Sequence, residues 1–191
     1  MTTFVRRTAP ASPPISRRIV RMWGDAMLMR LGRYEAELSV LLTDDATIRK
    51  LNRDYRQKDR PTDVLSFHFD AQPQSTGHAE CLLGDIVVSL DTAQRQAKGR
   101  KRSLEDEVRW LLAHGLLHLC GFDHGNVEQK RVMVAWTRRL VRAAQSSLPS
   151  ASVRLSTKVP PSPPRTRKPS ETVPLRGARP RRAVAQVAAG R

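Results

Sequence analysis

Hydrophobic residues recur along this chain at two periods, and the two periods predict alternating helices and strands. In residues 16–32, large apolar side chains fall at intervals of four from Ile19 to Leu31, which is typical of one face of an amphipathic helix. Gly32 is expected to end that helix. Residues 36–44 alternate and then turn apolar, which predicts a strand, and runs rich in β-branched and aromatic residues predict strands at 64–69 and 84–90. Further helices are predicted at 44–55, 91–99, 103–120 and 126–144.

The predicted helix at residues 103–120 differs from the others because it is apolar on nearly every side. Ser103 is a typical capping residue, and three acidic residues follow it in the first turn. Beyond residue 107 the only polar side chains are those of Arg109, His114 and His118. Such a helix is expected to be central and buried, where imidazoles need partners for their nitrogen atoms. The pattern predicts a single-domain α+β fold, in which helices and a sheet surround this buried, histidine-bearing helix.

Composition divides the 191 residues into three parts. From residue 146 to 191 the chain has eight of its thirteen prolines, ten basic residues, one acidic residue and no aromatic residue. Such a stretch cannot bury enough apolar surface to offset the entropy of ordering, so it is predicted to be a disordered basic tail. Residues 1–15 are likewise predicted to be a disordered basic N-terminus, which leaves residues 16–145 as the folded domain.

The net charge of +16 indicates a polyanionic partner. Residues 1–145 carry +7 of this charge, so the folded part is itself basic. Nucleic acid is the polyanion that such a chain meets most often in a cell. For the tail, the alternative is that its arginines serve only solubility.

Nothing in the sequence indicates export or a membrane. The first 18 residues lack the apolar stretch of a secretory signal, and no run of about 18 apolar residues is present to span a bilayer. We therefore expect a cytoplasmic protein with no membrane partner, in which Cys81 and Cys120 are free thiols. The alternative is an organelle transit peptide, because the N-terminus is rich in arginine and poor in acids.

The stretch "HGLLHLCGFDH" contains three of the five histidines. His114 and His118 are four residues apart, so they share one face of the predicted helix. Gly121 favours the positive φ that ends a helix, after which the chain can bring His124 back toward the same point. Three nitrogen ligands with one open position are typical of a catalytic zinc site. The alternative is a set of hydrogen-bonded core histidines.

The same spacing also occurs in metzincin metalloproteases, where a glutamate directly follows the first histidine and acts as the general base. Gly115 stands at that position here. A zinc metalloprotease is therefore only a remote alternative.

Three blocks together, "LNRDYRQKDRPTDVLSF", "LLGDIVVS" and "HGLLHLCGFDH", resemble the YbeY family of bacterial rRNA maturation factors over residues 40–144. The resemblance implies an α+β fold with a small mixed sheet and one zinc ion held by His114, His118 and His124. It also implies metal-dependent cleavage of single-stranded RNA in the 3′-end maturation of small-subunit rRNA and in ribosome quality control. Small-subunit ribosomal components are the implied partners, and the arginine used for RNA cleavage falls on Arg56.

Phosphodiester chemistry is consistent with these residues. Zinc held by three neutral imidazoles keeps its full charge and can lower the pKa of a bound water to about 7. A guanidinium opposite the metal would stabilise charge on the phosphate oxygens, which favours Arg56 as the catalytic cation. Lys58 and Arg60 are expected to bind substrate phosphates. From composition alone, the alternative is a solvated charged loop.

Some positions depart from the family pattern or leave their role open. His68 stands where the family usually has proline, and Phe122 stands where tyrosine is common. His68 is interpreted as a strand-edge residue, the alternative being a fourth polar group near the metal. Asp85 and Asp123 have no assigned role.

Two other classes of function stay open. One is a non-catalytic ribosome-assembly factor with a structural zinc. The other is a hydrolase of a small phosphorylated or amide substrate.

Overall fold

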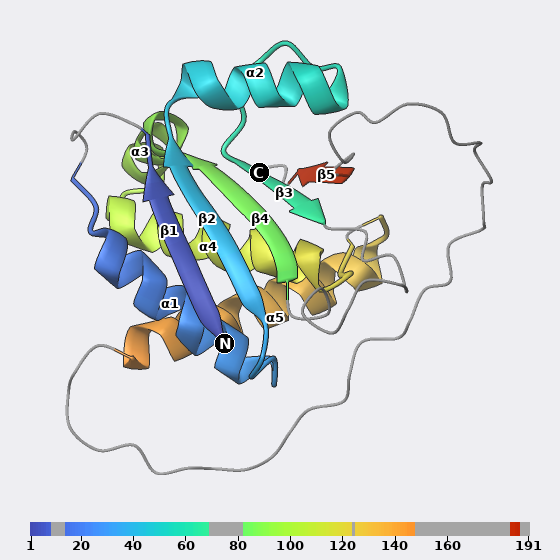
Figure 1. Ribbon diagram of the computed structural model, residues 1–191. Helices are drawn as coiled ribbons and strands as arrows, with labels where there is room; N and C mark the ends of the chain where they lie inside the picture. Colours follow the sequence, from blue (N-terminus) through green and yellow to red (C-terminus); the bar gives the residue numbers. More distant parts are fainter. Residues whose placement is uncertain (9–13, 69–81, 124, 148–183, 188–191) are drawn as a thin grey trace.

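The computed structural model describes residues 1–8, 14–68, 82–123, 125–147 and 184–187. Five helices and five strands are present in these ranges (Figure 1). In chain order they are β1 (Thr2–Arg7), α1 (Arg17–Arg30), β2 (Glu37–Thr43), α2 (Asp45–Arg56), β3 (Val64–His68), β4 (Leu82–Ser89), α3 (Leu90–Gly99), α4 (Leu104–Leu119), α5 (Val127–Ser146) and β5 (Val184–Val187). All the helices and strands predicted from the sequence are confirmed, with boundaries that differ by a few residues.

The strands form one mixed sheet in the order β1-β2-β4-β3-β5. β2 lies parallel to both β1 and β4, whereas β3 runs antiparallel to β4 and to β5. Val40 in β2 pairs with Val5 on one side and Ile86 on the other. The predicted α+β class with a small mixed sheet is therefore confirmed.

The two faces of the sheet are covered unequally. Leu38, Val40 and Leu42 point from β2 into the main core, which they share with α1, α4 and α5. Side chains of the opposite parity, such as Leu65 and Phe67 in β3, form a smaller cluster beneath α2. Figure 1 shows α2 above one end of the sheet, with the remaining surface of β1, β2 and β4 open to the viewer.

Helix α4 is the centre of the main core, as predicted. Its residues Leu112, Leu116 and Leu117 have no exposed surface. The Ser103 side chain accepts a hydrogen bond from the backbone N–H of Asp106 and so caps the first turn. The Ser103 cap thus defines where α4 begins, and packing of its apolar side chains in the core stabilises the rest of the helix.

The structure differs from the sequence prediction at the N-terminus. Residues 2–7 form strand β1, although residues 1–15 were predicted to be disordered. Pairing with β2 stabilises β1, and the backbone N–H of Thr3 donates to the Asp25 carboxylate in α1 at 2.8 Å. Both partners lie more than 20 residues away in sequence, so a local reading of this short, basic segment could not find the strand.

Strand β5 lies within the segment 146–191 that was predicted to be a disordered tail. Residues 184–187 pair with β3 at the end of the sheet. Residues 148–183 and 188–191 lie outside the described residues, so the tail and the domain limits of 16–145 stay predictions. In the described ranges, no helix combines the length and apolar character needed to cross a membrane.

Candidate metal centre

The last two turns of α4 hold His114 and His118 side by side. Their ring centroids are 4.9 Å apart and the ring planes are nearly perpendicular, at 89°. His118 is 2% exposed, whereas His114 is half-buried. The predicted spacing of four therefore does place both imidazoles on one face, with His118 inside the core and His114 nearer the surface.

Gly115, between the two histidines, allows α4 to lie close against the sheet. The Ser66 hydroxyl of β3 donates to the Gly115 carbonyl oxygen at 3.1 Å. A Cβ atom at position 115 would lie 3.0 Å from the Ser66 oxygen and 3.2 Å from a methyl group of Ile86. The glutamate that a metzincin protease needs at this position would crowd Ser66 and Ile86, which gives a physical reason against the protease alternative.

The turn after α4 starts as predicted. Gly121 has a φ of 82°, and its backbone N–H donates to the His118 carbonyl at 2.9 Å. Phe122 then packs against Trp136 of α5, with ring centroids 6.0 Å apart. Asn126 begins α5 with a reciprocal capping box to Gln129. His124 itself lies outside the described residues, but the chain is anchored on both sides of it.

The described half of the centre fits a metal ion. Two imidazole rings lie 4.9 Å apart at one end of a buried helix, and imidazole is a common ligand of zinc and other transition metals. Within the ranges that the structure covers, no three His, Cys, Asp or Glu side chains form a possible metal site. The assignment of His124 as the third ligand therefore stays a prediction.

Arg56 is the last residue of α2, on the opposite face of the sheet from α4. Its side chain is half-buried, and its Nη1 atom has no hydrogen-bond partner among the described residues. Burial lowers the pKa of the Arg56 guanidinium from its usual value. A guanidinium withdrawn from water in this way is suited to an incoming anion, because a phosphate would supply the missing acceptor.

Lys58 and Arg60 follow in an exposed loop, where the backbone N–H of Lys58 donates to the Asn52 carbonyl at 3.3 Å and that of Arg60 donates to the Lys58 carbonyl at 2.9 Å. Gln57 ends α2 with a positive φ of 59°. The side-chain amide of the buried Asn52 donates to the Arg60 carbonyl at 2.8 Å. The structure thus holds both cationic residues next to Arg56 along the chain, with their side chains in solvent.

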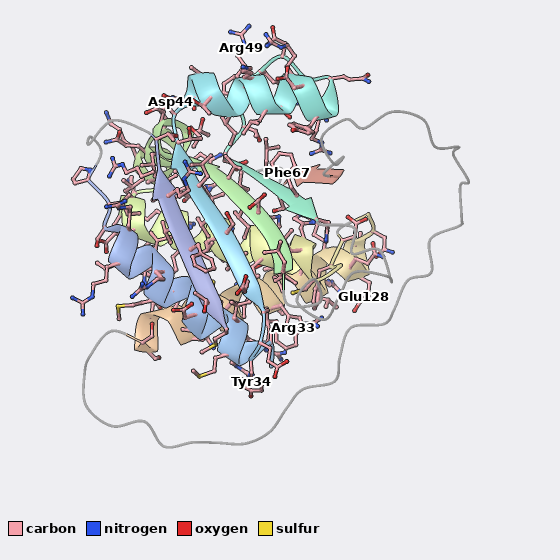
Figure 2. All side chains as sticks on the ribbon, viewed as in Figure 1. Arg33, Tyr34, Asp44, Arg49, Phe67 and Glu128 are labelled. Atoms are coloured by element: carbon pink, nitrogen blue, oxygen red, sulfur yellow. The ribbon has the colours of Figure 1, made fainter. Side chains whose placement is uncertain are left out.

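Two aromatic residues near Arg56 were not singled out by the sequence analysis. Tyr55 is 50% exposed and packs edge-on against Phe67, which lies beneath α2 (Figure 2). Together with Asp85 they line a cavity of about 290 Å³. Asp85 is therefore on the α2 face of the sheet, away from the histidine pair. The position of Tyr55 directly before Arg56 was the only signal available in the sequence.

A buried ionic cluster at the other end of α4 was also missed. Glu107 has no exposed surface and pairs with Arg100 and Arg102, the latter at 3.5 Å. Asp63 is 3% exposed and accepts a hydrogen bond from the side chain of Gln96 at 3.1 Å. Burial raises the pKa of both carboxyl groups, and the nearby Asp63 carboxylate raises the pKa of Glu107 further. The sequence marked Glu107 only as part of an acidic first turn.

The remaining candidates have simpler positions. His68 ends β3, pairs with Gly84 and is half-buried. It forms no group of three possible metal ligands with the described residues. Cys120 is a free thiol as predicted, and burial raises its pKa to about 11. Asp123 is exposed, and Cys81 lies outside the described residues.

The family model described as Endoribonuclease YbeY matches residues 13–145. The chain belongs to the YbeY family. The match extends from just before α1 to the end of α5 and includes Arg56 and all three predicted metal ligands. The resemblance drawn from three sequence blocks is thereby confirmed. β1 and the C-terminal segment with β5 lie outside the matched region.

Several curated relatives carry the same description, Endoribonuclease YbeY. The chain is 47% identical over 114 residues to the protein of Aquifex aeolicus (strain VF5), a region that is 59% of this chain and 73% of the relative. It is 45% identical over 137 residues to that of Gloeobacter violaceus (strain ATCC 29082 / PCC 7421), which is 70% and 71% of the two chains. For Anaeromyxobacter dehalogenans (strain 2CP-C) the identity is 48% over 126 residues, and the shares are 66% and 63%.

A solved structure agrees with the YbeY-like fold of this chain. The solution structure of TM1509 from Thermotoga maritima superimposes with a TM-score of 0.50 over 75% of this chain and 90% of that one. The two sequences are 20% identical. The likeness therefore supports the fold.

Proposed function

We propose that this YbeY-family protein is a metal-dependent endoribonuclease that cleaves single-stranded RNA, acting in 3′-end maturation of small-subunit rRNA and in ribosome quality control. The observation that carries the proposal is the pair of imidazoles on the buried helix α4, 4.9 Å apart, in a chain of this family. Small-subunit ribosomal components are the proposed partners, and the cytoplasm is the proposed location. The positive net charge supports a polyanionic substrate.

His114, His118 and His124 would hold one zinc ion. When bound, zinc supplies Lewis acidity toward a phosphodiester oxygen or a water of lowered pKa. The chain contributes a fixed geometry, because the 2% exposed His118 is held within the packed end of α4. The Ser66 hydrogen bond to the Gly115 carbonyl ties this part of the helix to β3. Two ligands are thus oriented by the core before any ion arrives, which lowers the entropic cost of binding it.

Arg56 would bind the phosphate group that is cleaved. Phosphodiester hydrolysis places additional negative charge on the phosphate oxygens, and a guanidinium presents two parallel N–H donors to them. The buried Nη1 atom of Arg56 is a donor that the described part of the chain does not engage. Lys58 and Arg60 would hold neighbouring phosphates, since their exposed charges follow Arg56 on a fixed loop.

Substrate would meet these two parts at the end of the sheet formed by β3 and β5. α2 and α4 each contact both of these strands, from opposite faces of the sheet. A single RNA strand that crosses this end could therefore contact Arg56 and the metal centre together.

Cleavage of a labelled single-stranded RNA with an unprocessed small-subunit rRNA 3′ end tests the proposal. Full-length protein would be compared in metal-free and zinc-reconstituted form, together with His118→Ala. His78→Ala is a matched control, because it removes a histidine outside the motif. We expect RNA cleavage only by the zinc-reconstituted wild type and by zinc-reconstituted His78→Ala. Binding of RNA without cleavage by any form would instead support an assembly factor with a structural zinc.

A further inference from the structure

The positive charge of the folded region is concentrated in its first 33 residues. These contain seven arginines and one acidic residue, Asp25, a net charge of +6. Residues 34–145, which include the whole candidate metal centre and Arg56, contain 17 basic and 16 acidic residues, a net charge of +1. The basic character of the domain therefore belongs to β1, α1 and the segments next to them, and the metal centre itself carries little of it.

β1 and the first two turns of α1 enclose a groove. Its volume is about 660 Å³, and it is lined by residues 2–5 of β1 together with Ser16, Arg17, Arg18 and Arg21. All three arginines are exposed. Arg17 and Arg21 are four residues apart on the helix and Arg18 lies beside them, so the three guanidinium groups come from one end of α1.

These guanidinium groups are available to a ligand. Within the described ranges, no ion pair involves Arg17, Arg18 or Arg21. The N-cap residue Ser16 makes no side-chain capping hydrogen bond, so the first backbone N–H groups of α1 also favour an anion. Three guanidinium groups and a helix N-terminus at one groove are complementary to a ligand with several closely spaced negative charges.

Phe4 of β1 also borders the groove, but its ring lies on the other face of the sheet. Thr3 and Val5 pair with Leu38 and Val40 and face α1, whereas Phe4 pairs with Ser39 and is 53% exposed on the face away from α1. The groove therefore offers a ligand cations and backbone N–H groups, which suit the regularly spaced phosphates of a single-stranded RNA.

We propose that the groove between β1 and α1 is a second RNA-binding site, which holds a single-stranded segment of the substrate away from the bond that is cut. This inference rests on the proposed function in taking RNA as the substrate. β1 and β3 are separated by β2 and β4, so the groove lies about 14 Å or more from the β3 side of the sheet, at the usual strand spacing of about 4.8 Å. Figure 1 shows β1 and α1 on one side and the β3 side opposite. The groove therefore increases the affinity for long RNA and takes no part in bond cleavage.

The test compares two triple variants of the full-length protein. The first is Arg17→Gln, Arg18→Gln and Arg21→Gln. The matched control is Arg138→Gln, Arg139→Gln and Arg142→Gln in α5, which removes the same charge from exposed arginines at the same spacing. Binding of a long single-stranded RNA is measured as a function of salt, with a chelator present so that no cleavage occurs. Cleavage of a short oligonucleotide by the zinc-loaded proteins is measured separately.

We expect the groove variant to bind long RNA on the order of tenfold more weakly at 0.1 M salt, with a salt dependence shallower by about 2 in log–log slope, since each lost phosphate contact removes about 0.7. The α5 control should stay close to wild type. Cleavage of the short oligonucleotide should be unaffected in both variants.

Equal losses in the groove variant and the α5 control would overturn the inference, because net charge alone would then explain the binding. Long-RNA binding by the groove variant at the wild-type level would overturn it as well. The proposed function fails in a different way, namely if the zinc-loaded wild type cuts no RNA. Circular dichroism of each variant excludes unfolding as the cause of a loss.

Discussion

The two ends of α4 bury polar side chains in opposite ways. At the N-terminal end, Glu107 is fully buried and its charge is met by arginines of this chain, Arg100 and Arg102. At the C-terminal end, His118 is almost as deeply buried, but its described ring neighbour is a second imidazole, His114. A buried carboxylate with its own cations stabilises a fold, whereas two neighbouring imidazoles are suited to an ion from solution. Burial alone therefore does not show whether a polar side chain has a structural or a functional role. The chemistry of the neighbouring side chains does show it.

The strongest way to break this comparison is His118→Ala. It removes one of the two described donors, so we expect loss of zinc binding and of RNA cleavage down to the level of the metal-free protein. The fold should persist, with a fall in the free energy of unfolding of about 1–3 kcal/mol for the cavity. Zinc content by mass spectrometry and denaturant unfolding measure the two effects. Full zinc content in this variant would contradict the metal site.

Arg56→Ala sharpens the comparison, because it changes the proposed chemistry without changing a metal ligand. We expect unchanged zinc content and a fall in the cleavage rate of about 10²–10³-fold, the usual cost of removing one group that stabilises developing charge. Arg49→Ala is a matched control, since Arg49 lies on the same helix, exposed and paired with Asp59 (Figure 2). If both variants cleave at the wild-type rate, Arg56 has no catalytic role.

Glu107→Ala tests the structural end of α4. The change removes the carboxylate that pairs with Arg100 and Arg102 and leaves a cavity in the core, so the free energy of unfolding should fall by about 3 kcal/mol. The affinity of the folded protein for zinc should stay at the wild-type value. Glu105→Ala, an exposed position in the same turn, should change stability by less than about 0.5 kcal/mol. A selective loss of zinc affinity in Glu107→Ala would mean that the two ends are not separate.

The smallest expected effect is the pH dependence caused by Asp63. Burial raises the pKa of Asp63 above its unfolded value of about 4, so the folded state favours the protonated carboxyl. The stabilising contribution is complete below about pH 4 and is lost as the pH rises through the folded pKa. Asp63→Asn should remove this fall in the free energy of unfolding with rising pH. At neutral pH the free energies of unfolding of the variant and the wild type should differ by about 1 kcal/mol or less. Urea unfolding of both proteins from pH 4 to pH 8 measures this difference. If the free energy of unfolding changes with pH in the same way in both proteins, the pH dependence does not come from Asp63.

The sequence alone was sufficient for the elements whose signals are local. The apolar spacing from Ile19 to Leu31, the Ser103 cap and the glycine after α4 each act within a few residues, and all three are present as predicted. The spacing of His114 and His118 is local too, because the geometry of one helix determines it. For the same reason, three short blocks were enough to identify the YbeY family.

Tertiary structure alone decided the features that depend on distant partners. β1 exists because Thr2 pairs with Glu37 and its neighbours pair in turn. Its edge then forms the basic groove with α1, which no periodicity in either segment indicates. Glu107 was indistinguishable from its acidic neighbours until packing buried it against Arg100 and Arg102. Local spacing determines which side chains share a face, but only the packing of distant segments determines which charges are buried and where grooves form.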